Sequence, residues 1–365
     1  MMRVLVIETT VFGYDGISNV VLNYYKYQNH EKVWMDLLTI NPVNDTLKKL
    51  LNQNKNQNFI LPCRNRNPFK YVRQLVKIIR EGEYDIIHVH GCSATMAVEM
   101  LAGKLAGVDV RIAHSHSTKC NHMWINRFLR IFFKRWCNYG FACGEEAGKW
   151  LFPKKEFCVI PNGIDLEKFR YDEAMRNLFR KKNNLDGKFV VGHIGRFSMA
   201  KNHEKLVDIF AKISKRVPNS ILVLIGDGEL REQIENKVKT LNLNVLFVGL
   251  SSQVEKWLQA MDVMVFPSIF EGLPLSLVEA QATALPCMLS DSISPMTKIT
   301  DLVRFESLDA TAETWADDTI SLVKSFDRNK YSSEVKDMIR KAHYDIRENC
   351  AELVSQYERM VSESK

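Results

Sequence analysis

The sequence lacks several features whose absence argues against whole classes of protein. No run of about eighteen apolar residues occurs, which disfavours a membrane-spanning helix. The 8 cysteines follow no CxxC or other ligand spacing, so we expect free thiols in place of disulfides or zinc. Neither first turn contains GxGxxG, which disfavours a redox enzyme that binds a dinucleotide. Residues 1–10 have the pattern of a β-strand without a small-residue cleavage site, so we expect a cytoplasmic protein.

Basic residues are concentrated in the first half of the chain. Up to Arg170 there are 24 Lys and Arg against 15 Asp and Glu, whereas the remainder has 26 against 28. This imbalance indicates an acidic partner for the first half, either a membrane surface or a phosphorylated acceptor, although a solvated basic face explains it equally well. The length of 365 residues favours two domains.

Short apolar strands alternate with helical segments along most of the chain, which predicts an α/β fold with doubly wound sheets. A strand at residues 3–8 runs into a loop with Gly13 and Gly16 before the first helix. The same pattern restarts at Lys188, where a second sheet begins. A charge-rich segment separates the two patterns, and we place the inter-domain linker near residues 169–173.

Two consecutive strands, at residues 84–90 and 110–118, carry histidines toward their carboxyl ends. In open α/β sheets, ligands bind outside the carboxyl ends of the strands. We therefore predict that His116 belongs to a binding site, whereas His88 and His114 are expected to pack in the core.

A second candidate site is the stretch at residues 266–284, where Glu271 and Glu279 flank a loop that leads into a helix. Pro274 suits the start of that helix, whose free N–H groups attract anions. The carboxylates need hydroxyl or amine donors, so the stretch predicts a ligand that carries both phosphate and sugar. Taken alone, two glutamates at this spacing are more often solvated surface residues.

Residues 124–137 predict a basic amphipathic helix with an aromatic stripe. Arg127, Arg130 and Lys134 lie on one helical face, and the apolar residues of another face are Ile125, Phe128, Leu129, Phe132, Phe133 and Trp136. Such a stripe usually packs on a sheet. With the basic charge of this half, it also fits peripheral contact with the inner face of an anionic cell membrane.

Taken together, Gly195, Arg196, Lys201, Glu271 and Glu279 resemble the signature of the family-4 retaining glycosyltransferases of GT-B architecture. The resemblance covers nearly the whole chain and is most specific over IGRFSMAKNHEKL, LIGDGELRE and FVGLSSQVEKWLQAMDVMVFPSIFEGLPLSLVEAQA. Enzymes that build capsular polysaccharide or exopolysaccharide in bacteria are the most similar members.

The resemblance implies two doubly wound, Rossmann-like domains that face each other across a cleft. Residues 1–170 would form the acceptor-side domain, and residues 171–343 would form the domain that binds the nucleotide sugar. The final helix, within residues 344–365, would cross back to the first domain.

The resemblance also implies a role for each catalytic position. Arg196 and Lys201 would hold the donor diphosphate in place of a metal bound by an Asp-x-Asp motif, so no metal or cofactor is expected. Fixed cations stabilise the charge that develops on the phosphate as the sugar bond breaks. Glu279 matches the glutamate that binds the ribose hydroxyls, and Glu271 matches the one near the forming bond. His116 matches a histidine that contacts the donor sugar.

Other positions are implied to bind the substrate, mostly through their backbone. Gly16 matches a glycine close to the donor phosphate, and residues 249–252 lie where the base is read. The implied substrate-binding positions are Gly16, Gly195, Gly249, Leu250, Ser251, Leu273, Pro274, Leu275, Ser276 and Glu279. The first loop departs from the family pattern, because Asp15, Gly16, Ile17 and Ser18 stand where two glycines and a glutamate are usual. Acceptor binding by this loop is therefore open.

The implied reaction transfers a hexosyl unit from a nucleoside diphosphate sugar, with UDP as the expected nucleotide, to a hydroxyl. The acceptor would be a glycan or a polyprenyl-diphosphate-linked sugar, and the anomeric configuration would be retained. The leaving phosphate would help to deprotonate the acceptor, so no protein nucleophile is required, although Glu271 would be the carboxylate to suspect in a covalent route. Two alternatives stay open, a UDP-sugar epimerase of the same fold and a non-catalytic nucleotide-sugar-binding subunit. No nucleic-acid partner is expected.

Overall fold

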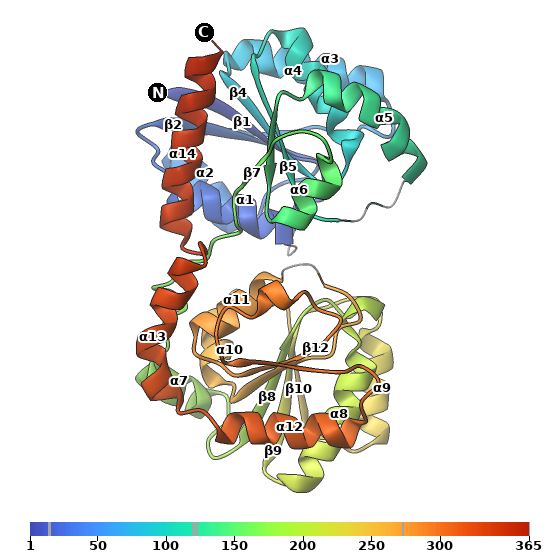
Figure 1. The fold of residues 1–365 in the computed structure, drawn as a ribbon, viewed down its shortest axis with the longest axis vertical. Coiled ribbons are helices and arrows are strands. Elements are labelled where there is room, and N and C mark those ends of the chain that lie inside the picture. Colours follow the sequence, from blue (N-terminus) through green and yellow to red (C-terminus); the bar gives the residue numbers. More distant parts are fainter. Residues whose placement is uncertain (14–15, 119, 121–122, 272–273, 365) are drawn as a thin grey trace. The chain divides into compact units, whose positions relative to one another are not determined.

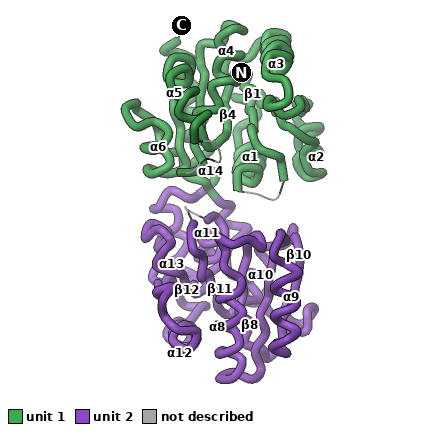
Figure 2. Tube along the Cα trace, turned by 90° about the vertical axis from the view of Figure 1, so that its right-hand side faces the viewer, with its two compact units in different colours: residues 1–163, 346–365 green, residues 164–345 purple. Residues whose placement is uncertain are grey.

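The chain folds into two compact units, which Figure 2 colours separately. The computed structural model describes residues 1–13, 16–118, 120, 123–271 and 274–364. Unit 1 comprises residues 1–163 and 346–365, and unit 2 comprises residues 164–345. The sequence placed the division after Arg170. In the structure Ile164, Leu166 and Phe169 are buried in the core of unit 2.

The described residues of unit 1 form a 7-stranded sheet in which each neighbouring pair of strands is parallel, in the order β3-β2-β1-β4-β5-β6-β7. The strands are β1 (Met2–Glu8), β2 (Val33–Thr39), β3 (Asn58–Ile60), β4 (Ile86–Gly91), β5 (Val110–Ser115), β6 (Tyr139–Ala142) and β7 (Cys158–Val159). The register pairs Glu8 with His90, and His90 with His114, at the carboxyl ends of three adjacent strands.

Helices cover both faces of this sheet (Figure 1). They are α1 (Gly16–Tyr27), α2 (Asp45–Gln53), α3 (Pro68–Gly82), α4 (Ala97–Ala106) with the short η1 (Ala94–Met96) before it, α5 (Met123–Trp136), α6 (Glu145–Leu151) and α14 (Ile346–Glu363). Side chains alternate between the faces of a strand. Ile87 and Val89 therefore face the core beneath α3, α4 and α5, whereas His88 faces Tyr357 of α14.

The helix predicted at residues 124–137 is confirmed as α5, but its apolar stripe is divided. Phe133 is buried in the core, and Leu129 and Trp136 are partly buried against it. Phe128 and Ile125, in contrast, are 66% and 51% exposed. The helix therefore packs on the unit and also leaves part of its apolar surface open. In the described part of the chain, no helix is both long and apolar enough to cross a bilayer.

The second sheet, in unit 2, is also parallel. Its described strands are ordered β10-β9-β8-β11-β12-β13. They are β8 (Phe189–Ile194), β9 (Ser220–Ile225), β10 (Val245–Gly249), β11 (Val263–Phe266), β12 (Cys287–Ser290) and β13 (Val303–Glu306). The helices are α7 (Glu173–Lys182), α8 (His203–Arg216), α9 (Arg231–Thr240), α10 (Val254–Ala260), α11 (Leu275–Ala282), α12 (Ala312–Lys324) and α13 (Arg328–Lys341), with η2 (Met199–Lys201) and η3 (Pro295–Thr297).

Both faces of the second sheet are buried, which explains why its strands are almost continuously apolar. Val190 and Val223 belong to one core cluster, whereas Val191 and Leu222 belong to the cluster on the opposite face. The predicted α/β fold with two doubly wound parallel sheets is confirmed. Most candidate site residues lie in the loops at the strand ends, whereas Glu279 lies inside α11 and Gly16 begins α1.

Candidate active site

Three loops at the carboxyl ends of β8, β9 and β10 are joined by backbone hydrogen bonds. The Gly195 N–H donates to the Ile225 carbonyl at 2.9 Å, and the Gly226 N–H donates to the Gly249 carbonyl at 2.9 Å. Gly195 and Gly249, both predicted site residues, thus lie on neighbouring loops. The shared hydrogen bonds fix the loops against one another, as a preorganised ligand site requires.

The turn after β9 is a feature of this site that the sequence prediction left out. Gly226 has φ +138, and a Cβ added there would lie 2.1 Å from the carbonyl oxygen of Gly195. A Cβ on Gly228 would lie 2.6 Å from the carbonyl oxygen of Phe197. Only glycine permits such backbone contact. The Gly-Asp-Gly sequence at residues 226–228 could have indicated that another backbone segment comes close, but it does not indicate which one.

Lys201 and Glu271, both predicted catalytic residues, form a mostly buried ion pair. Lys201 Nζ lies 2.6 Å from Glu271 Oε1, and the two side chains are 16% and 14% exposed. The Lys201 ammonium also lies 4.4 Å from the centre of the Phe266 ring. Burial lowers the pKa of Lys201, and the attraction of Glu271 opposes that change.

The backbone around η2 explains why these two residues meet. The Ile269 N–H donates to the Ala200 carbonyl at 2.8 Å, and Asn202 Nδ2 donates to the Pro267 carbonyl at 3.1 Å. The loop after β11 is therefore held against η2, which ends at Lys201. A Cβ added to Gly195 would lie 3.0 Å from Lys201 Cε, so this glycine leaves room for the lysine side chain.

Arg196 stands in a more open environment than Lys201. Its side chain is 73% exposed, and Arg196 Nε donates to Glu229 Oε2 at 3.1 Å. An exposed pair of this kind contributes little to stability, so a ligand phosphate can replace Glu229 at small cost. Glu229 was not predicted, and its place in the LIGDGELRE segment was the only signal for it.

The predicted residues at the start of α11 lie where a ligand could reach the helix end. Pro274 is the residue before the helix, and among the described residues no side chain caps its first turn. Pro274, Leu275 and Ser276 are each partly exposed. The free N–H groups of a helix end attract anions. Leu273, which was predicted to join them, lies outside the described residues.

Glu279 lies about one turn inside α11, as predicted, and forms a second, separate acidic position. Burial raises the pKa of its carboxyl to about 7, an effect that Lys168 reduces and Glu255 increases. Lys168 Nζ and Glu255 Oε2 are 3.2 Å apart. These two neighbours were not predicted, because each lies on a different segment with no signal of its own.

The loop at residues 249–252, where the nucleotide base was predicted to be read, follows from the end of β10. Gly249 has φ +76, which favours glycine, and the Leu250 side chain is 53% exposed. Ser251 is partly exposed, and its Oγ accepts a hydrogen bond from the Gln253 N–H at 3.1 Å. The loop therefore offers one apolar side chain and a fixed hydroxyl next to the glycine turns.

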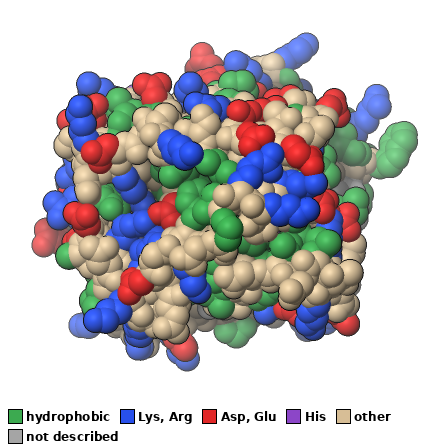
Figure 3. Space-filling view, turned by 90° about the horizontal axis from the view of Figure 1, so that it is seen from below, with side chains coloured by type: hydrophobic (Ala, Val, Ile, Leu, Met, Phe, Trp, Pro, Cys, Tyr) green, Lys and Arg blue, Asp and Glu red, His purple; other side chains and the backbone are tan. Residues whose placement is uncertain are grey.

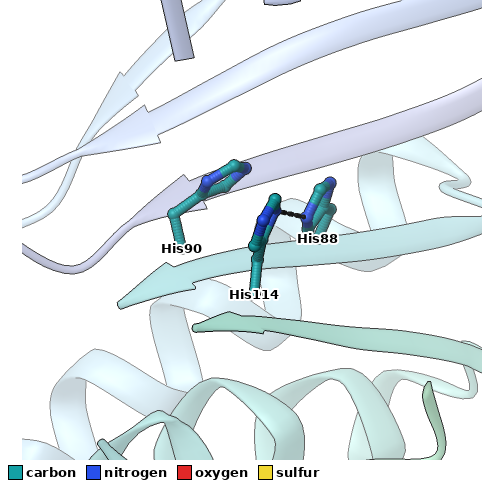
Figure 4. A group of neighbouring side chains, drawn as sticks. All are labelled: His88, His90 and His114. Atoms are coloured by element: carbon teal, nitrogen blue, oxygen red, sulfur yellow. Dashed lines mark hydrogen bonds between the residues drawn. The ribbon is translucent and has the colours of Figure 1, made fainter. Parts of the chain in front are cut away.

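Unit 1 brings together three histidines of β4 and β5 and His116, which follows β5, and Figure 4 draws the three from the strands. His90 Nδ1 and His116 Nε2 are hydrogen bonded at 2.9 Å, and His88 Nε2 and His114 Nδ1 at 3.1 Å. His88 Nδ1 is also hydrogen bonded to the Tyr357 hydroxyl at 2.6 Å. His88 and His114 are buried, as predicted. His90, which ends the strand predicted at residues 84–90, pairs with His116, and this pairing was not predicted.

These histidines are neutral at physiological pH, because burial lowers the pKa of His116 to about 3 and that of His88 to about 3. The nitrogens of His88, His90 and His114 lie within 4.8 Å of one another, close enough that they could hold a metal ion. The hydrogen bonds above already use both nitrogens of His88 and one nitrogen each of His90 and His114.

The first loop of unit 1 contains a buried carboxylate that was not predicted. Glu8, at the end of β1, is 1% exposed, and its Oε1 accepts a hydrogen bond from Ser18 Oγ at 2.8 Å. Ser18 is one of the positions that departs from the family pattern. A Cβ added to Gly16 would meet no described atom within 4 Å, so the start of α1 is open there. Asp15 lies outside the described residues.

The two parallel-sheet units match the GT-B architecture of glycosyltransferases, and comparison with known proteins shows this class. The profile described as Glycosyltransferase Family 4 matches residues 14–168, and the profile described as Glycosyl transferases group 1 matches residues 175–337. EpsF of Bacillus subtilis (strain 168) is 33% identical over 361 residues, which cover 94% of this chain and 93% of EpsF. The chain therefore belongs to the group 1/family 4 glycosyltransferases.

Two further relatives are informative. The Escherichia coli UDP-Gal:alpha-D-GlcNAc-diphosphoundecaprenol alpha-1,3-galactosyltransferase is 30% identical over 306 residues, or 76% of each chain. Among solved structures, Anabaena HepE in complex with UDP superposes with a TM-score of 0.78 at 18% identity, covering 97% of this chain and 100% of HepE. At 18% identity, this structural likeness shows a shared fold only.

The raised pKa of Glu279 predicts a stability that falls with pH. A carboxyl that ionises near 4.5 in the unfolded chain and at about 7 in the folded chain destabilises the fold as pH rises through that window. We expect Glu279→Gln to raise the free energy of unfolding at pH 8 by about 2–3 kcal/mol, and by much less at pH 5. Denaturant unfolding at both pH values measures this.

The matched control is Glu232→Gln, which removes an exposed glutamate from α9. This control should change stability little at either pH. An equal effect of Glu279→Gln at pH 5 and pH 8 would contradict the burial of a protonated Glu279.

Proposed function

We propose that this glycosyltransferase transfers a hexosyl unit from a UDP-sugar to a hydroxyl of a glycan or polyprenyl-diphosphate-linked acceptor, with retention at the anomeric carbon. The biological role we propose is bacterial surface polysaccharide synthesis. The observation that carries the proposal is the buried Lys201–Glu271 pair, which lies in the same unit as the exposed Arg196 and the uncapped start of α11. The names of the E. coli galactosyltransferase and of the HepE–UDP complex support the choice of nucleotide and acceptor.

The two cations are suited to a diphosphate because each is held by a carboxylate that a phosphate can replace. Glu229 holds Arg196, and Glu271 holds Lys201. When the donor binds, its phosphate oxygens would take these positions and receive charge-assisted hydrogen bonds. The same cations would then stabilise the charge that develops as the glycosidic bond breaks. Glu271, released from Lys201, would be able to accept hydrogen bonds from hydroxyl groups of the donor sugar.

The nucleoside would be bound farther along the same loops. A carboxylate at Glu279 can accept hydrogen bonds from both ribose hydroxyls. The loop formed by Gly249, Leu250 and Ser251 would contact the base through the exposed leucine and the backbone. The first N–H groups of α11 would receive phosphate or sugar oxygens.

The proposed chemistry uses no protein nucleophile and no metal. Glu271 would be engaged by hydroxyl groups of the donor sugar, and the leaving phosphate would accept the proton of the incoming hydroxyl on the same face. His116 would act as a neutral hydrogen-bonding group toward the donor sugar, oriented by His90. Arg196 and Lys201 would supply the positive charge that a metal provides in other transferases.

The function can be tested by supplying radiolabelled UDP-, GDP- and ADP-sugars to the purified protein together with a membrane extract. Transfer from a UDP-sugar to a lipid-linked or soluble glycan is the expected result. Conversion of the UDP-sugar without an acceptor would indicate an epimerase. UDP-sugar binding without turnover would indicate a non-catalytic subunit, and either result would overturn the proposal.

Removing either cation should mainly slow the reaction. We expect Arg196→Ala or Lys201→Ala to lower turnover by on the order of a hundredfold or more, because each removes a donor that stabilises the transition state. Arg216→Ala is the matched control, since Arg216 pairs with Asp317 at the far end of α8. Near-normal turnover in both site variants would contradict the phosphate assignment.

Binding of UDP should depend on the ionisation of Glu279. Because only the carboxylate accepts two ribose hydrogen bonds, UDP affinity should rise as pH increases through about 7. Calorimetry with the wild type and Glu279→Gln separates this effect from the titration of UDP itself, which both proteins share. A wild type whose pH dependence equals that of the variant would rule out the ribose role.

Chelation provides a direct test of the metal-free proposal. Turnover in excess EDTA should equal turnover in added Mg²⁺ or Mn²⁺, because Lys201 and Arg196 supply the charge. A loss of activity in EDTA that added metal restores would overturn this part of the proposal.

A further inference from the structure

An apolar groove of about 1010 Å³ lies between α3, α4 and α5 of unit 1. Its walls include Val72 and Val76 from α3, Leu101 from α4, and Phe132 and Trp136 from α5. Other side chains of these helices, among them Leu75, Met100 and Phe133, are buried in the core of the unit. Apolar hollows of this size on a protein surface usually mark an interaction site.

Aromatic side chains continue from the groove along α5. Trp124, Phe128, Phe132 and Trp136 follow at intervals of four residues, so they share one helical face. The ring centroids of Phe128 and Phe132 are 5.6 Å apart, and those of Phe132 and Trp136 are 5.2 Å apart. Trp124 is 83% exposed, and Phe69 at the start of α3 is 88% exposed. Neither side chain is stabilised by burial in the unit.

The helices beside the groove are strongly basic. On α3, Lys70, Arg73, Lys77 and Arg80 follow at helical spacing, and all four are exposed. Glu81 is the only acidic residue within α3, and it pairs with Lys77 at 3.7 Å.

The charge of α5 adds to this surface. Arg127, Lys134 and Arg135 are exposed, and residues 123–136 include no acidic side chain. The face of the molecule drawn in Figure 3 is different, because Lys and Arg side chains are interspersed there with Asp and Glu. The excess of basic residues in the first half of the sequence is thus partly explained by these two helices.

We propose that this α3–α5 surface, made of the groove, the aromatic residues of α5 and the basic residues of α3 and α5, docks on an anionic lipid bilayer. Charge complementarity favours lipid as the occupant, because Lys and Arg beside an anionic membrane surface are attracted to its headgroups. Tryptophan and phenylalanine next to basic side chains are typical of helices that lie in the membrane interface. The shallow apolar groove would receive acyl chains.

This inference extends the expectation drawn from residues 124–137 alone, since α3 supplies the longer basic ridge and α4 a wall of the groove. It does not depend on the proposed reaction. Lipid docking can fail while UDP-sugar transfer is observed, and the reverse is also possible.

The proposal is tested by co-sedimentation of the full chain with vesicles of phosphatidylcholine alone or with about one third phosphatidylglycerol. We expect binding to the anionic vesicles and much weaker binding to the neutral ones. Replacing Lys70, Arg73 and Lys77 with glutamine should weaken binding to anionic vesicles by roughly a hundredfold, since each charge contributes about fivefold. The matched control replaces Lys181, Lys182 and Lys239, exposed lysines of unit 2, with glutamine.

A second measurement tests insertion of the aromatic residues. Lipids brominated on their acyl chains should quench tryptophan fluorescence in the wild type, and this quenching should fall strongly in Trp124→Ser, an exposed change that the fold tolerates. Absence of vesicle binding by the wild type would overturn the proposal. Binding that is equal on neutral and anionic vesicles, or equally weakened by the unit 2 control, would also overturn it.

Discussion

The parallel direction of the strands is the constraint on which both candidate sites depend. In a parallel sheet every carboxyl end lies at the same edge, so the loops that follow the strands gather there. In unit 2 this edge collects Gly195, Gly226, Gly249 and Glu271 from β8, β9, β10 and β11. In unit 1 it collects Glu8, His90 and the residues after β5. Residues far apart in the sequence meet because their strands are neighbours.

Within unit 2, close backbone packing and buried charge have complementary roles. The glycine turns bring the loops after β8 and β9 so close that their backbones touch, which fixes the two loops against each other before any ligand binds. The charged side chains at this edge are less firmly held than the backbone. Lys201 and Arg196 are held by carboxylates, and desolvation raises the pKa of the partly buried Glu279. The backbone of this edge is therefore rigid, whereas its charged side chains carry part of the cost of desolvation.

Much of this arrangement could be predicted from the sequence, and the remainder could not, for identifiable reasons. The apolar strands and the Rossmann-like units were predictable because their periodicity is local. Family motifs identified Lys201 and Glu271, yet their direct contact depends on Ile269 and Asn202, which join the β11 loop to η2. Nothing local marks Glu8 or Glu255, since the importance of each comes from its spatial neighbours, and Glu229 is marked only by its place in the LIGDGELRE segment. Likewise, the aromatic stripe of α5 was visible, but its division between core and surface was not.

The ends of unit 2 lie beside each other. The Ile164 N–H donates to the Tyr344 carbonyl at 2.8 Å, and Ile164 forms a parallel bridge with Asp345. Unit 2 is therefore a continuous insertion in the chain of unit 1, whose last helix is made only after the insertion is complete. A ribosome would have to finish the whole of unit 2 before unit 1 could acquire Tyr357 and close over His88. The order of synthesis thus places the hydrogen bond between Tyr357 and His88 after the synthesis of unit 2.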